Sequence, residues 1–126
     1  MQRLIFVTVL LLYVSAGISQ KVPEGIIQAF KTGDARELST HFHTNIEIQI
    51  IKETQIVSRN QAARIMQDFF SKHPPVSFNV SYEDFELDTK YGLGTMVTTK
   101  ESFRINLYFM EVKKKKYIYY LNIEKI

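Results

Sequence analysis

From residue 76 onward the chain alternates apolar and polar residues, and no stretch in it has helical spacing. This period of two is typical of half-buried strands, and it predicts four of them, at residues 76–82, 91–97, 102–109 and 117–123. Phe85 and Leu87 continue the first strand on the opposite parity, so we expect a bulge or bend at Glu83–Asp84. Both faces of the fourth strand carry bulky residues, so we expect it inside the sheet.

The N-terminal half begins with two predicted helices. The first covers residues 23–32, because Pro23 suits the first helical position and Gly33 suits the residue after the end. The second is short, and Asp34 caps it with Glu37 completing a capping box. Its buried side is formed by Leu38 and Phe42, and we expect it to fray near residues 43–45.

A hairpin and a third helix follow. Isoleucines alternate with Glu47 and Gln49 over residues 45–51, which predicts a strand that turns at 52–55 and pairs with Ile56–Val57. Ser58 and Gln61 then form a capping box. The helix behind it has apolar residues on one face, at Ala62, Ile65, Met66, Phe69 and Phe70. Pro74 and Pro75 end it, because proline cannot supply the next amide donor.

Helices grouped early and strands grouped late predict one α+β domain with three N-terminal-half helices on one face of a curved antiparallel sheet. The bend in the first long strand curves that sheet. Helices lying across its concave side would then enclose a cone-shaped hollow.

Residues 1–19 have the layout of a secretory signal peptide. Arg3 precedes an apolar run, Leu4–Val14, which is about half of the roughly 20 residues that a bilayer span needs. Small residues follow, so we expect cleavage near Ser19/Gln20, a single domain over residues 20–126, and export to the periplasm or beyond. The chain has no cysteine, which excludes disulfides, a thioether-linked lipid and thiol catalysis. Predicted export together with the lack of cysteine favours assignment of the chain to the bacterial envelope proteins.

The net charge of +3 falls to +2 once Arg3 is removed, and the basic excess lies in residues 89–126. Most of it comes from Lys113, Lys114, Lys115 and Lys116. This run is either a solvated loop between two strands or a contact for phosphate or anionic lipid. It lacks the Gly or Asn that a tight hairpin prefers, which predicts a longer, mobile turn.

Two segments carry a family resemblance. Ala29–Leu38 contains a helix that ends in a Gly-Asp step, and Leu38 and Phe42 then form a Leu-x-x-x-Phe pair. Phe103–Phe109 and Tyr117–Glu124 look like a closing pair of strands. Together they resemble the nuclear transport factor 2-like superfamily, a cone-shaped, cystatin-like fold. Within it the chain is similar to an uncharacterised exported bacterial family, domain of unknown function 4783, over residues 22–126.

The resemblance implies a fold and a sheet-to-sheet homodimer, but the superfamily includes isomerases, dehydratases, cyclases, adaptors and ligand binders. Its enzymes place polar and ionisable residues inside the cone. In this chain the positions expected to face the hollow are mostly Ile, Val, Phe and Tyr, and no Asp/His or Asp/Arg pair can be assigned there.

Four tyrosines are candidate ligand-binding residues, since phenol hydroxyls in a pocket can orient a carbonyl or hydroxyl group. They are Tyr82, Tyr91, Tyr108 and Tyr120. Their alternating strand positions equally suit core and cross-strand packing.

Metal and acid–base chemistry have weaker support. His41 and His43 form a His-x-His pair at a predicted helix end, where positions two apart point in different directions. We therefore expect no metal and no cofactor. Catalytic carboxylates need partial desolvation, whereas the acidic residues here resemble a solvated strand end beside one helical acid. They are Glu83, Asp84, Glu86 and Asp88, with Asp68 on the third helix.

These patterns favour a non-catalytic envelope domain that binds a small apolar ligand or a protein partner in or around the cone. One alternative is a small isomerase, lyase or hydrolase acting in the cone. Another is an adaptor that docks on anionic surfaces through Lys113–Lys116. The small net charge and the predicted export argue against nucleic-acid binding. No phosphate loop, dinucleotide fingerprint or nucleophile elbow occurs.

Overall fold

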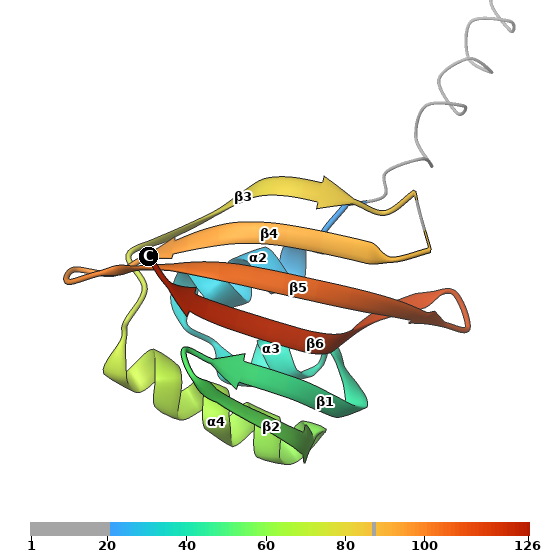
Figure 1. The fold of residues 1–126 in the computed structure, drawn as a ribbon, viewed down its shortest axis with the longest axis horizontal. Helices are drawn as coiled ribbons and strands as arrows, with labels where there is room; N and C mark the ends of the chain where they lie inside the picture. Colours follow the sequence, from blue (N-terminus) through green and yellow to red (C-terminus); the bar gives the residue numbers. More distant parts are fainter. Residues whose placement is uncertain (1–20, 87) are drawn as a thin grey trace, which may run out of the picture.

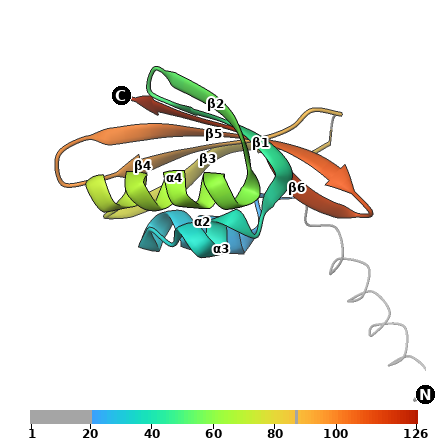
Figure 2. The same ribbon diagram turned by 90° about the horizontal axis from the view of Figure 1, so that it is seen from below.

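A computed structural model describes residues 21–86 and 88–126 of the protein. Within them, six strands form one curved sheet in the order β2-β1-β6-β5-β4-β3, and three helices cover one of its faces (Figures 1 and 2). The elements, in chain order, are α2 (Glu24–Thr32), α3 (Ala35–Ser39), β1 (Phe42–Ile50), β2 (Glu53–Ser58), α4 (Arg59–Lys72), β3 (Ser77–Asp84), β4 (Lys90–Val97), β5 (Ser102–Val112) and β6 (Lys115–Lys125). The predicted α+β class is confirmed.

The predicted leader, its cleavage point and Leu87 lie outside the described residues. No helix in the described part of the chain is long and apolar enough to cross a bilayer.

Local capping explains where the helices begin and end. Gly33 adopts the left-handed conformation (φ 71°) that closes α2. The Ser58 capping box opens α4 with both reciprocal hydrogen bonds in place. At α3 only half of the predicted box forms: the Asp34 carboxylate accepts from the Glu37 amide at 3.0 Å, but the Glu37 carboxylate lies 3.4 Å from His41 instead.

The predicted end of α3 was wrong. This helix stops at Ser39 and Phe42 already belongs to β1, although its side chain is buried as expected. The reason is tertiary pairing, which overrides the helical pattern. The Ile118 amide donates to the His41 carbonyl at 2.7 Å, and the Arg59 side chain donates to the Phe42 carbonyl at 3.0 Å.

The sheet departs from the predicted antiparallel pattern at one place, because β1 and β6 run parallel. All other neighbours are antiparallel. As predicted, β6 lies inside the sheet. The bulge in β3 lies between Val80 and Tyr82, two or three residues before the predicted position. A second register shift lies between Tyr108 and Phe109 of β5, where the facing strand β6 has one extra residue, Tyr119.

Aromatic side chains fill the space between α2 and the sheet. The Phe30 ring stacks on Phe78 at 4.9 Å between centroids and meets the Phe70 ring edge-on at 5.7 Å. Gly94 provides the room for Phe78, since a Cβ on this glycine would lie 2.4 Å from the Phe78 Cζ atom. Aromatic rings therefore pack closely between α2 and β3.

Candidate functional site

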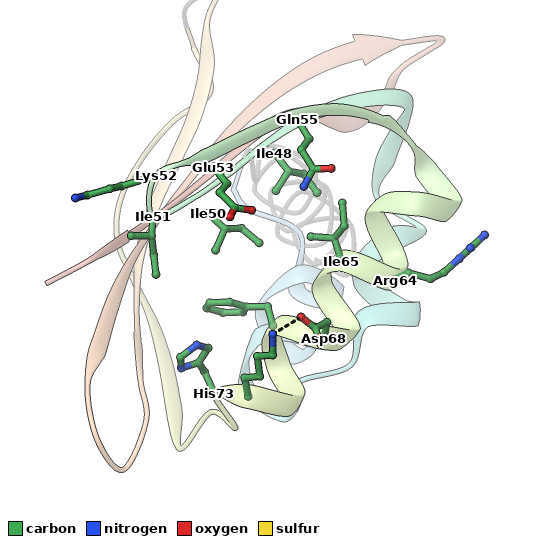
Figure 3. Close-up of a pocket in the computed structure, with 12 residues that line it drawn as sticks. Ile48, Ile50, Ile51, Lys52, Glu53, Gln55, Arg64, Ile65, Asp68 and His73 are labelled. Carbon is green, nitrogen blue, oxygen red and sulfur yellow. Dashed lines mark ion pairs between the residues drawn. The ribbon is translucent and has the colours of Figure 1, made fainter.

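The cavity of interest opens between the β1–β2 hairpin and α4 and has a volume of about 630 Å³ (Figure 3). Its apolar wall consists of Ile48 and Ile50 from β1 and Ile65 and Phe69 from α4. Ile48 and Phe69 are buried, whereas Ile50 and Ile65 are half-buried. An apolar surface therefore remains accessible at the hairpin end of the domain, within the size range of small-molecule sites.

Strand and helix periodicity place these side chains together. Ile48 and Ile50 are two residues apart on β1, so both face α4. Ile65 and Phe69 are four residues apart and lie on the same face of the helix. Ile51 and Lys52 form the two-residue turn that joins the strands, because Ile50 pairs with Glu53.

Charged and polar groups form the rim of the cavity. The Asp68 and Lys72 side chains make an ion pair of 3.0 Å, and they are 65% and 68% exposed. Figure 3 shows the Glu53 carboxylate directed into the opening, while Lys52 and Arg64 point away from it. The rim thus offers hydrogen-bonding and charged partners around an apolar centre.

His73 closes one end of the cavity. It is the C-cap residue of α4, and its amide donates to the Phe69 carbonyl at 2.9 Å. Its ring centroid lies 4.9 Å from that of Phe69 and 5.0 Å from that of Phe103. These contacts fix a half-buried imidazole beside the apolar wall.

Of the predicted carboxylates, only Asp68 lines this cavity. Its exposure supplies none of the desolvation that an acid–base catalyst requires. Glu83 instead accepts a hydrogen bond of 2.7 Å from the Val22 amide, and Asp84 accepts one of 3.1 Å from the Glu86 amide. Glu83 and Asp84 thus stabilise the backbone at the β3–β4 end of the sheet, where Glu86 and Asp88 also lie.

The four predicted tyrosines do come together, but on the face of the sheet that the helices leave uncovered. Strand register explains this, because Tyr91 pairs with Tyr108 and Tyr108 with Tyr120, opposite the inward Gly92 and Leu107 positions. Neighbouring ring centroids in the row Tyr82–Tyr91–Tyr108–Tyr120 lie 6.1, 4.9 and 5.3 Å apart.

Hydrogen bonds anchor this tyrosine row. The Tyr91 hydroxyl donates to the Asn106 side-chain oxygen at 2.6 Å, and the Tyr120 hydroxyl donates to the Gln49 side-chain oxygen at 2.9 Å. Burial, with a smaller contribution from Tyr108, raises the pKa of the Tyr91 phenol above its usual 10.0. The phenol is therefore a protonated donor at neutral pH.

The lysine run forms a tight turn, so the predicted long, mobile loop was wrong. Val112 pairs with Lys115, which leaves Lys113 and Lys114 as the two turn residues. Both have positive φ, 51° and 66°, which the twist of a two-residue hairpin favours. For a non-glycine residue this conformation costs roughly 1–2 kcal/mol. Lys116 lies over the Phe85 ring, 5.7 Å from its centroid.

The two histidines of the His-x-His pair point to different partners. His41 lies beside Glu37, and the His43 ring lies 6.3 Å from the Tyr117 ring. No group of three or more His, Cys, Asp or Glu residues that could hold a metal occurs in residues 21–86 and 88–126.

Comparison with known proteins agrees with this fold. Residues 23–124 match the model of a family described as "Domain of unknown function (DUF4783)". The chain belongs to the DUF4783 family. A DUF4783 crystal structure from Bacteroides ovatus shares 30% sequence identity and a TM-score of 0.80, covering 86% of this chain and 98% of that one. Its counterpart from Bacteroides uniformis shares 31% identity and a TM-score of 0.79, covering 84% and 98%.

More distant structures share the fold alone. A nuclear transport factor 2-like protein of unknown function from Shewanella baltica has 9% identity and a TM-score of 0.65, covering 82% of this chain and 86% of that one. No curated protein matches the chain. The DUF4783 assignment confirms the expected family, and this neighbour confirms the expected nuclear transport factor 2-like fold.

Sequence reasoning missed most of the cavity. It named Asp68, but it gave no binding role to Ile50, Ile51, Ile65 or His73. One signal was present: the Ile50–Ile51 doublet breaks the alternation of β1 and puts an apolar residue into a turn.

Proposed function

We propose that this DUF4783 domain binds a small anionic amphiphile, with its apolar body in the cavity between the β1–β2 hairpin and α4. The observation that carries the proposal is the accessible apolar surface of half-buried Ile50 and Ile65, behind which the buried side chains of Ile48 and Phe69 complete the wall. A bound hydrocarbon would remove this surface from water, which stabilises the complex by about 25 cal/mol per Å².

One cation at the rim, Lys72, supports an anionic head group. Lys52 and Arg64 also line the cavity but point away from its opening. Half-buried His73 adds a hydrogen-bonding group at one end. A carboxylate or sulfonate at the opening could pair with Lys72, which would exchange its exposed partner Asp68 for the ligand.

A titration tests this proposal. The purified protein is titrated with 1-anilinonaphthalene-8-sulfonate, followed by fluorescence, and the bound probe is then displaced with decanoate or decanol. We expect saturable binding, with decanoate the better competitor. The variant Ile65→Asn should weaken probe binding, whereas Ile56→Thr, a change on the opposite face of the hairpin, should not. Unsaturable binding, or equal binding by Ile65→Asn, would contradict the proposal.

We also propose that residues 1–19 are a secretory leader that is removed before Gln20. The support is the Arg3, apolar and small-residue succession. Expression of the full chain in a bacterium, followed by fractionation and N-terminal sequencing, tests it. An uncleaved protein in the cytoplasm would contradict it.

A homodimer through the uncovered sheet face is a separate proposal. Tyr82, at one end of the tyrosine row, is 54% exposed, and Tyr119, beside Tyr108, is 39% exposed. Such aromatic side chains are favoured in interface centres. Sedimentation of wild type and Tyr82→Ser at several concentrations tests it: a concentration-dependent dimer that the variant weakens is expected, and a monomer throughout would contradict it.

The β5–β6 turn favours a second candidate function, docking on an anionic lipid surface. Lys113 and Lys114 hold a strained backbone conformation although glycine or asparagine would suit it better. Strain of this kind is typical of functional sites. Sedimentation with vesicles containing phosphatidylglycerol tests the proposal, and we expect the replacement of Lys113–Lys116 by serine to abolish association. Unchanged association, or binding to anionic polysaccharide alone, would contradict it.

A further inference from the structure

Ile51 combines a strained backbone with an accessible apolar side chain. Its φ is 59°, in the left-handed region, where a β-branched residue is an outlier. Its surface is 42% exposed. The residue therefore lowers the stability of the turn without contributing a fully buried side chain to the core.

The turn itself has no need for isoleucine. The Ile51 amide donates to the Ile123 carbonyl at 2.8 Å, which extends the β1–β6 ladder by one hydrogen bond. That bond uses only the backbone, so glycine or asparagine would make it with less strain. The side chain has to be explained by something other than the fold.

Its position offers the explanation. Ile51 lines the cavity beside Ile50, and Figure 3 shows its side chain directed from the turn toward the side on which His73 lies. We propose that Ile51 is a ligand-binding residue, an apolar lip that covers the hydrocarbon part of the amphiphile at the mouth of the cavity. This inference rests on the proposed function.

If Ile51 covers the ligand, its replacement should change stability and affinity in opposite directions. Replacing Ile51 by glycine relieves the left-handed strain and removes the lip. We expect Ile51→Gly to raise Tm by roughly 2–6 °C and to weaken binding of 1-anilinonaphthalene-8-sulfonate about 5- to 20-fold, the loss of part of a buried isoleucine contact. Ile51→Asn should behave in the same way, because asparagine tolerates the left-handed region but is polar.

Two matched variants separate the side chain from the backbone. Ile51→Val keeps both the β-branch and an apolar surface, so it should retain affinity within about threefold and gain no stability. Ile56→Thr removes an isoleucine that is 77% exposed on the opposite face of the same hairpin, and it should leave probe affinity unchanged.

The outcomes are distinguishable. If wild type binds the probe saturably and Ile51→Gly has a probe affinity within twofold of wild type, Ile51 is not a ligand-binding residue, and the proposed function stands. A Tm lowered by Ile51→Gly would show a structural role for the side chain and would also overturn the inference. Absence of saturable binding by wild type would overturn both.

Discussion

The Tyr91 hydroxyl donates a 2.6 Å hydrogen bond to the side-chain oxygen of Asn106 on the adjacent strand. Asn106 is only 8% exposed, and its amide nitrogen donates in turn to Glu124 at 2.9 Å. One phenol therefore satisfies a polar group that has little access to water, on the sheet face that the helices do not cover.

Removing this phenol should destabilise the domain. Tyr91→Phe leaves the Asn106 oxygen without its donor, and we expect the free energy of unfolding to fall by about 1–3 kcal/mol in urea denaturation. Tyr82→Phe is the matched control, because this neighbouring tyrosine is largely exposed, and it should change stability by less than about 0.5 kcal/mol. Equal effects of the two variants would contradict the role of the hydrogen bond.

The same residue should make stability depend on pH in the alkaline range. The pKa of Tyr91 is raised in the folded state, mainly by burial, above the 10.0 of a free tyrosine. The folded protein therefore holds this proton more tightly than the unfolded chain. The resulting stabilisation is complete below pH 10.0 and is lost as pH rises through the folded pKa. Urea midpoints from pH 8 to 11 should fall more steeply for wild type than for Tyr91→Phe, and parallel curves would refute this.

A side chain at Gly94 should clash with the core. The added Cβ of Gly94→Ala would lie 2.4 Å from the Cζ atom of Phe78, a side chain that is 1% exposed. We expect a loss of about 1–3 kcal/mol, measured by thermal and urea unfolding. The double variant Gly94→Ala/Phe78→Leu replaces the ring by a smaller side chain. Its loss of unfolding free energy should be smaller than the sum of the losses of the two single variants. Strict additivity would mean that the two residues do not compete for space.

Residues suited to the β5–β6 turn should stabilise it. Lys113→Asn/Lys114→Gly places the preferred dipeptide where both φ values are positive, and we expect a gain of about 1 kcal/mol. Lys115→Asn/Lys116→Gly removes the same charge from strand positions and should bring no gain. A gain from the second pair instead would point to charge repulsion within the lysine run.

Local signals were sufficient for most of the elements, because caps and periodicity act over a few residues. The Ser58–Gln61 box and the apolar face of α4 illustrate this. The start of β1 could not be predicted in the same way. It depends on the pairing of Phe42 with Ile118, which lies far along the chain.

The site needed information that no local pattern contains. Periodicity groups Tyr91 and Tyr108 on one face, but which face the helices cover depends on the whole fold. The cavity likewise arises where Ile50 of a hairpin meets Ile65 of a helix. Positive φ at Ile51 and Lys113 also ran against residue preference, since neither residue type favours that conformation.

The position of β6 between β1 and β5 has a consequence for how the chain folds. The hairpin β1–β2 and the meander β3–β4–β5 have no backbone pairing with each other. Only β6 joins them, because it pairs with β1 on one side and with β5 on the other. A growing chain would therefore hold two half-sheets with open edges, and the cooperative step waits for β6. Pairing between such distant segments slows folding. The polypeptide therefore stays unfolded for longer, and it can be bound or transported in that state.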